Sequence, residues 1–244
     1  MDARQSRVVE RCAVGLHMTG LVSLKGLDGR DAVARFTARI MAVQRQRSGG
    51  PDGLTSITHS AQFGSRRAER IARSGLAPRT EGPSPVHPPR LLFLACLRAP
   101  AQGGHMRLAD RKKLYLDMTQ RRPAAAAVFS AASAAFFGGS GGITAPVFDR
   151  RGDARVSPRL SPARTVRWHA KAKTHLPALQ DALARNEITV KHQAGEGVLV
   201  DSRRWASGRT TSAGPYEFMW ALGSPHNKLP MSVRPTQQAQ GGTA

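Results

Sequence analysis

The chain has 244 residues, of which 37 are Lys or Arg and 16 are Asp or Glu, so its formal net charge is +21. Two cysteines exclude a disulfide framework and a cysteine-based zinc site. Aromatic residues make up only 5% of the chain, which together with the charge predicts a small core and large disordered or low-complexity segments. The positive charge favours nucleic acid or another polyanion as the partner.

The first hundred residues divide into two predicted segments. Residues 1–50 are expected to be a basic amphipathic helical segment, because four apolar residues recur at helical spacing within 28–47, namely Val33, Phe36, Ile40 and Val43. Residues 51–106 are expected to hold an arginine-rich helix at 65–75, a proline-rich linker, and a short apolar run at 91–97. That run, LLFLACL, fits either a buried strand or part of a helix.

The remainder of the chain divides into four further segments. Residues 107–137 predict a basic helix followed by an alanine-rich helix, and 138–166 predict a linker rich in Gly, Pro and Arg. A small α+β element is expected at 167–222, and a polar tail at 223–244. The expected fold class is therefore mainly α, with large disordered or low-complexity segments.

Residues 167–201 hold the only pattern that combines a helix with strands. The run THLPALQDALARN predicts a helix, and EITVKH and GVLVD predict two strands joined around Gly195 and Gly197. This helix plus β-hairpin resembles the last part of a winged-helix DNA-binding domain. The resemblance implies that the helix reads a groove and that the hairpin forms the wing.

Residues 119–145, TQRRPAAAAVFSAASAAFFGGSGGITA, allow three interpretations. Two arginines before an apolar run resemble a twin-arginine export signal, which requires translation to start at Met118. The sequence around Ser140 fits G-x-S-x-G and resembles the nucleophile elbow of α/β-hydrolases, which implies a triad of Ser140, Asp201 and His226. The third interpretation, a short helix and a flexible hinge, is preferred because the chain lacks the alternating strands and helices of a doubly wound sheet.

The leading hypothesis is a non-enzymatic polyanion-binding protein, of RNA or DNA, that contacts phosphates without clear base specificity. The residues expected to make these contacts are Arg66, Arg67, Arg70, Arg73, Lys112, Lys113, Arg121 and Arg122. A serine hydrolase is one alternative. Another alternative is an exported effector or a reading frame without a selected function. The codons of Arg, Ala, Gly and Pro are all GC-rich, so a GC-rich reading frame would be rich in these residues without any selection for binding.

Neither a metal site nor a cofactor is expected, since no phosphate-binding, dinucleotide-binding or metalloprotease motif is present. No apolar run is long enough to cross a bilayer. An intracellular location is favoured, nuclear if the source is eukaryotic.

Overall fold

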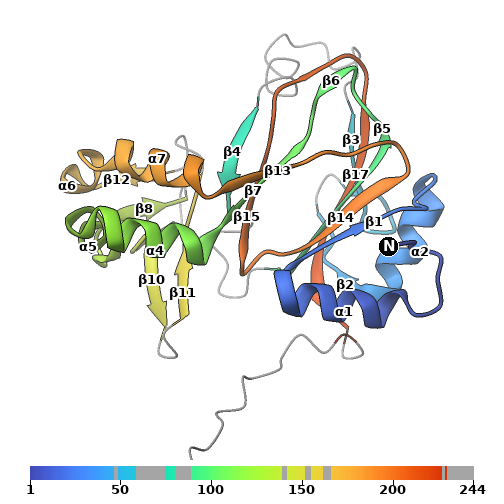
Figure 1. The fold of residues 1–244 in the computed structure, drawn as a ribbon, viewed down its shortest axis with the longest axis horizontal. Coiled ribbons are helices and arrows are strands. Elements are labelled where there is room, and N and C mark those ends of the chain that lie inside the picture. The colour runs from blue at the N-terminus through green and yellow to red at the C-terminus, as the bar shows by residue number, and fades with distance from the viewer. Residues whose placement is uncertain are drawn as a thin grey trace, which may run out of the picture.

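The computed structural model describes residues 1–46, 49–58, 75–80, 89–138, 142–151, 155–161, 166–226 and 229. They form an α+β fold dominated by antiparallel strands. Figure 1 shows a sandwich of two sheets on one side and a layer built mainly of helices on the other. The expectation of a mainly α chain is therefore wrong.

The larger sheet has the strand order β1-β14-β5-β17-β2, and β3 also pairs with β17. All of these pairings are antiparallel. The strands are β1 (Leu21–Leu24), β14 (Glu196–Asp201), β5 (Leu91–Arg98), β17 (Glu217–Pro225), β2 (Met41–Val43) and β3 (Thr55–Thr58).

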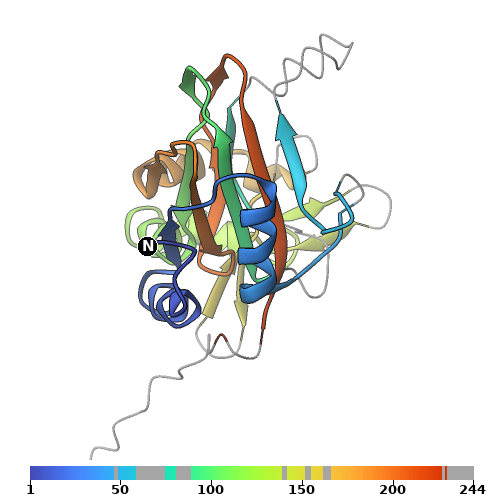
Figure 2. The same cartoon turned by 90° about the vertical axis from the view of Figure 1, so that its right-hand side faces the viewer.

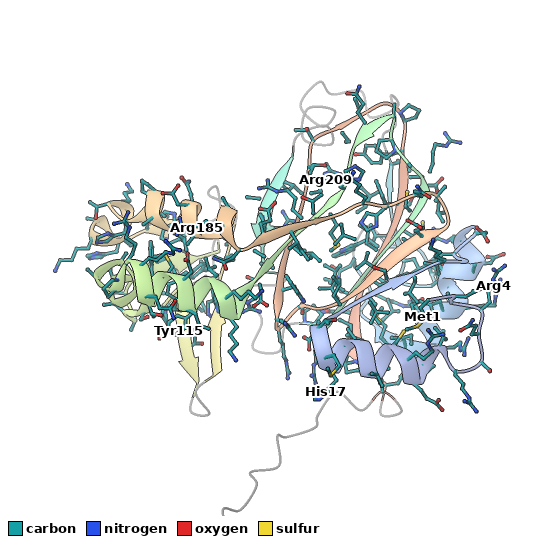
Figure 3. All side chains as sticks on the ribbon, viewed as in Figure 1. Met1, Arg4, His17, Tyr115, Arg185 and Arg209 are labelled. Atoms are coloured by element: carbon teal, nitrogen blue, oxygen red, sulfur yellow. The ribbon has the colours of Figure 1, made fainter. Side chains whose placement is uncertain are left out.

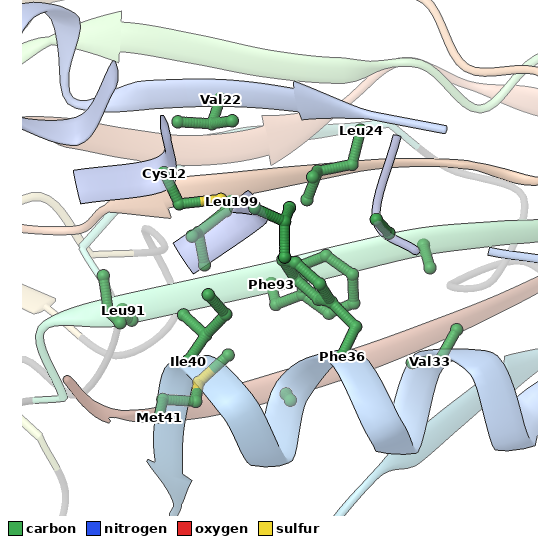
Figure 4. Packing of buried hydrophobic residues seen from close by; sticks show 14 of the residues in the cluster. Cys12, Val22, Leu24, Val33, Phe36, Ile40, Met41, Leu91, Phe93 and Leu199 are labelled. Atoms are coloured by element: carbon green, nitrogen blue, oxygen red, sulfur yellow. The ribbon is translucent and has the colours of Figure 1, made fainter. Parts of the chain in front are cut away.

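Two helices, α1 (Val8–Thr19) and α2 (Arg30–Ile40), pack their apolar sides into the core on the outer face of this sheet. Figure 2 shows α2 covering the face of the strands. Phe36 of α2 contacts Phe93 of β5 with ring centroids 5.1 Å apart, and both are buried (Figure 4). The prediction of a helix with Val33, Phe36 and Ile40 on one buried face is confirmed. The helix ends at Ile40, however, and Val43, the fourth residue of the predicted face, lies in β2.

The apolar run at 91–97 is strand β5, and its composition follows from burial on both faces. Leu91, Phe93 and Ala95 belong to the core beneath α1 and α2. Leu92 and Cys96, which alternate with them, belong to cores on the opposite face. A strand covered on both sides has no polar positions, so its sequence shows no alternation.

The smaller sheet has the order β13-β7-β15-β4. Its strands are β13 (Glu187–Val190), β7 (Met106–Asp110), β15 (Trp205–Arg209) and β4 (Leu76–Arg79). Met106 and Leu108 on its inner face pack with Leu92, Val198 and Leu222 of the larger sheet. These residues form the interior of the sandwich.

The outer face of the smaller sheet is covered by the helical layer, because Ala109 of β7 and Ala206 of β15 lie in the same core as Phe129, Phe137 and Phe148. This layer contains α4 (Arg111–Arg121), α5 (Pro123–Ser130), α6 (Ala170–Lys173) and α7 (Leu176–Arg185). It also contains β8 (Ala135–Phe137), β9 (Ile143–Ala145), β10 (Phe148–Arg151), β11 (Arg155–Pro158) and β12 (Val166–Trp168). The short strands β6 (Gln102–Gly103) and β16 (Ser212–Ala213) pair with each other.

Three details of the predicted secondary structure are corrected. Residues 107–110 belong to β7, and helix α4 begins only at Arg111, where the Asp110 carboxylate accepts hydrogen bonds from the backbone N–H groups of Lys112 and Lys113. The alanine-rich run forms α5 as expected, but residues 135–137 are strand β8. The span 138–166, expected as a linker, contributes strands β9, β10 and β11.

The two strands predicted near the end of the chain exist, but they do not form a hairpin. Strand β13 pairs with β7 in the smaller sheet, whereas β14 pairs with β1 and β5 in the larger one. The winged-helix resemblance is therefore wrong. Among the described residues, no helix is both long enough and apolar enough to span a membrane.

Candidate ligand site between the two sheets

Arg79 and Ser207 lie opposite each other on neighbouring strands of the smaller sheet. Ser207 is the Cα partner of Arg79 on β4 and of Leu108 on β7. Directly opposed residues of an antiparallel pair point to the same face. Leu108 is fully buried in the interior of the sandwich, so Arg79 and Ser207 also lie on the inner face.

Strand β4 is held against β15 by an irregular pairing around a glycine. Ser207 pairs with Arg79 but Arg209 pairs with Leu76, so the register shifts between these two positions. A side chain at Gly208 would meet the backbone of β4, with a Cβ 2.8 Å from the carbonyl carbon of Ala77. The close approach therefore requires glycine at 208, and it fixes where Arg79 emerges.

Arg209 is the second arginine on this face, because it is the Cα partner of Met106, whose side chain is buried in the interior. Its Nη1 donates a 3.3 Å hydrogen bond to Tyr216 Oη, and its guanidinium lies 5.8 Å from the centroid of that ring. Tyr216 is itself buried against Phe218. Figure 3 shows Arg209 on the sandwich, away from Arg185 in the helical layer.

Arg79 differs from Arg209 in having no anchor of this kind. Its side chain is half-buried, and among the described residues it makes no hydrogen bond or ion pair. A half-buried guanidinium loses part of its hydration, and this one gains no partner among the described residues, so it favours an incoming anion.

A buried histidine lies near the strand ends where Arg209 is located. His192 is 6% exposed, packs against Phe218 with ring centroids 6.4 Å apart, and its Nε2 has no hydrogen-bond partner within the described ranges. Burial, together with a smaller effect of His105, lowers the pKa of His192 to about 4 against an opposing effect of Glu196. The imidazole is therefore neutral at pH 7.

Comparison with known proteins gives the family. The sequence profile described as "Taurine catabolism dioxygenase TauD, TfdA family" matches residues 3–221. The chain belongs to the TauD/TfdA family. No curated protein sequence matches it significantly.

Solved structures with the TauD/TfdA fold resemble this chain at low identity. An asparagine oxygenase in complex with Fe(II), 2S,3S-3-hydroxyasparagine and succinate has a TM-score of 0.64 and 16% identity, covering 88% of this chain and 79% of that one. PvcB from Pseudomonas aeruginosa has a TM-score of 0.69 and 14% identity, covering 89% and 80%. OrfP in complex with Fe, succinate and (3S)-hydroxy-L-Arg has a TM-score of 0.68 and 13% identity, covering 96% and 85%. At these identities the likeness concerns the fold.

Family membership corrects the functional expectations. A family of dioxygenases overturns the hypothesis of a non-enzymatic, arginine-rich nucleic-acid or polyanion binder, and with it the expectation against an enzyme. The ligands named for the similar structures are iron and small organic acids, not nucleic acids.

The four described residues that were expected to contact phosphate lie at opposite ends of one helix. Lys112 and Lys113 are exposed in the first turn of α4, whereas Arg121 and Arg122 lie at its other end, about 14 Å away along the axis. Arg121 pairs with Asp117 at 2.8 Å. Arg66, Arg67, Arg70 and Arg73 lie outside the described residues.

Arg121 and Arg122 line a cavity of about 300 Å³ in the helical layer, together with Ala178, Asp181 and Arg185. Arg185 also pairs with Asp117, at 2.7 Å. This cavity belongs to α4, α5 and α7 and lies apart from the inner face that carries Arg79.

The alternative catalytic triad has no support in the described residues. Asp201 lies at the end of β14, where one carboxylate oxygen is 3.4 Å from Arg90 and the other accepts from the backbone N–H of Arg203. His226 follows β17, and its Nε2 lies 3.1 Å from the carbonyl oxygen of Ala38. Ser140 lies outside the described residues.

The described residues do not fit the iron that similar structures contain. Non-haem iron(II) oxygenases bind the metal with two histidines and one carboxylate. In the part of the chain that the structure describes, no group of three His, Cys, Asp or Glu residues is placed to hold a metal ion. The inner face instead carries Arg79 and Arg209, whose guanidinium groups have no lone pair to offer a metal.

Sequence reasoning missed Arg79, Ser207 and Arg209 because it did not predict the smaller sheet. The segment VLVDSRRWASGR does hold a signal, since two short β-rich runs flank a polar turn. The pairing with β4, which brings Arg79 opposite Ser207, has no local signal.

Proposed function

We propose that this TauD/TfdA-family protein binds a small organic acid between its two sheets, with the guanidinium of Arg79 as the main anchor. The observation that carries the proposal is the half-buried Arg79 on the inner face, which has no partner among the described residues. Arginine presents two parallel N–H donors that match a carboxylate. A bound carboxylate would restore the interactions that Arg79 loses on burial.

Arg209 supports a second carboxylate contact. It lies two residues beyond Ser207 on β15, which places its Cα about 7 Å farther along the strand. Its contact with Tyr216 holds the guanidinium in one orientation. Two cations on one face favour a short dicarboxylate over a monocarboxylate, and we assign the class of 2-oxoglutarate and succinate.

The dicarboxylate class agrees with what similar structures contain. Succinate is named in the titles of an asparagine oxygenase and of OrfP, and another PvcB structure is titled an Fe, alpha-ketoglutarate dependent oxygenase. In this chain the protein groups would bind and orient the acid through charge-assisted hydrogen bonds. Leu92, Leu108 and Val198 would exclude water from one side of it.

Titration calorimetry of the purified full-length chain with 2-oxoglutarate and with succinate tests this function. Arg79→Gln removes one charge-assisted contact, worth about 1.5–3 kcal/mol, so binding should weaken roughly 10- to 100-fold. Arg35→Gln changes an exposed arginine on α2 and serves as the matched control. Absence of binding to either acid, or equal weakening by both substitutions, would contradict the proposal.

A further inference from the structure

We infer that the acid is bound without a metal ion, so that this chain departs from the iron-containing structures that share its fold. The identity of the ligand rests on the proposed function. The absence of iron rests on the described residues. The two claims are tested by separate arms of the experiment below.

The interior of the sandwich carries arginine side chains where a metal ion would need imidazole or carboxylate ligands. The row that crosses the smaller sheet consists of Arg79, Ser207 and Leu108, and the next row pairs Met106 with Arg209. A guanidinium group carries a positive charge and only N–H donors, so it offers nothing that a metal could bind. A ferrous ion near these side chains would be repelled by two fixed positive charges and would find no imidazole or carboxylate in either row.

The described residues that most resemble a set of metal ligands lie at one end of the sandwich. The charges of His105 and Glu196 both act on His192, so the three groups are neighbours. They do not form a metal-binding group. One Glu196 oxygen pairs with Lys25 at 3.4 Å, and the other accepts a 3.1 Å hydrogen bond from the backbone N–H of Gln193. The carboxylate is therefore held by a lysine and by the loop backbone, groups unrelated to a metal.

The other described histidines are dispersed over the fold. His17 lies on α1, His169 and His175 border α6, and His226 follows β17. His169 Nδ1 caps α6 by accepting from the N–H of Lys171. None of these lies on the inner face of the smaller sheet, so none can complete a site beside Arg79.

The positive charge that a metal gives to an acidic ligand is supplied here by guanidinium groups. Arg79 is free to accept a carboxylate, and Arg209 is already oriented by Tyr216. Binding of the acid should therefore be indifferent to chelators. It should depend on ionic strength, because both contacts are electrostatic.

The experiment uses the full-length chain after exhaustive treatment with EDTA. In one arm the protein is dialysed anaerobically against Fe(II), and in parallel against Mn(II), and bound metal is measured by mass spectrometry. In the other arm 2-oxoglutarate is titrated calorimetrically in EDTA and again in Mn(II). We expect a metal content near zero and affinities for 2-oxoglutarate that agree within twofold.

One ferrous ion per chain, or an affinity for 2-oxoglutarate at least tenfold higher with Mn(II), would overturn the inference. Stoichiometric metal that is lost in His192→Ala but kept in Arg79→Gln would overturn it in a specific way, by placing the metal at the His105–His192 end. If neither acid nor metal binds, the proposed function fails while the metal arm still supports the absence of iron.

Discussion

Arg79 and Ser207 face each other across two strands of the smaller sheet, on the side that points into the sandwich. The sheet brings a cation and a hydroxyl together in a fold whose solved relatives contain iron.

Removing the charge of Arg79 should stabilise the protein when no acid is present. The half-buried guanidinium has no partner among the described residues, so Arg79→Gln removes a desolvation cost of about 1 kcal/mol. For a chain of this size that corresponds to a rise in melting temperature of roughly 2–4 °C. Calorimetric melts should show this rise for Arg79→Gln and no change for Arg35→Gln; a lower melting temperature for Arg79→Gln would mean that the side chain already has a stabilising partner.

A pair of histidines at these positions should create a metal site where the described residues offer none. Cβ atoms of opposed residues lie about 4.5–5.5 Å apart, so Arg79→His combined with Ser207→His places two imidazoles within reach of one ion. We expect the double variant to bind Ni(II) or Zn(II) in titrations in which the native chain and each single variant show at least tenfold weaker binding. Equal binding by the native chain would show that residues 79 and 207 are not opposed in the sheet, or that their side chains do not form the metal site.

Gly208→Ala should destabilise the protein by about 1–3 kcal/mol, because the new methyl group meets the backbone of β4. Gly29→Ala is the matched comparison: Gly29 has a positive φ of 87° but nothing within 4 Å of a Cβ, so it tests backbone strain alone. Urea unfolding should give the larger loss for Gly208→Ala and a parallel loss of acid binding. A Gly208→Ala variant with native stability would show that β4 is not packed against β15 in this way.

Arg111 should be essential for stability although it is a charge inside the protein. It is 6% exposed, and its guanidinium donates to the carbonyl oxygens of Ser202 at 2.7 Å and Pro158 at 2.6 Å. Burial lowers the pKa of Arg111 to about 10, so it remains charged at pH 7. Arg111→Met leaves those carbonyls without their donor and should cost about 3–5 kcal/mol in urea unfolding, whereas Arg122→Met, at an exposed site, should cost less than about 0.5 kcal/mol.

His192 should make stability fall as the solution is acidified from about pH 6.5 towards pH 4. Its pKa is about 4 in the folded protein and 6.5 in the reference state, so the unfolded chain binds more protons in this window. The difference corresponds to a loss on the order of 3 kcal/mol across the window. His192→Leu should flatten this part of the profile, and His17→Gln, at an exposed site, should leave it unchanged. Identical profiles for the native chain and His192→Leu would refute the burial of this imidazole.

Local patterns predicted the helices better than they predicted the sheets. The face of Val33, Phe36 and Ile40 identified α2, because one side of that helix meets the core and the other meets water. The run at β5 is apolar throughout because it is covered on both faces, so its period could not distinguish strand from helix. The strands at 187–190 and 196–201 were found, yet their partners lie in two different sheets.

The candidate site could not be predicted, because it depends on pairing between residues far apart in the sequence. Arg79 belongs to a short strand that follows residues outside the described ranges, and Ser207 lies near the other end of the chain. The large positive charge suggested phosphate contacts at Lys112, Lys113 and Arg121. The charges that matter to the proposal are instead the two arginines turned towards the interior, which no count of charges could separate from the others.

The most direct test is a crystal structure of the EDTA-treated protein with 2-oxoglutarate. The account predicts density for the acid between the sheets, with a carboxylate about 2.7–2.9 Å from the Arg79 guanidinium and no anomalous signal from a metal beside it. A metal peak that coordinates the acid, or an acid bound away from Arg79, would contradict the account.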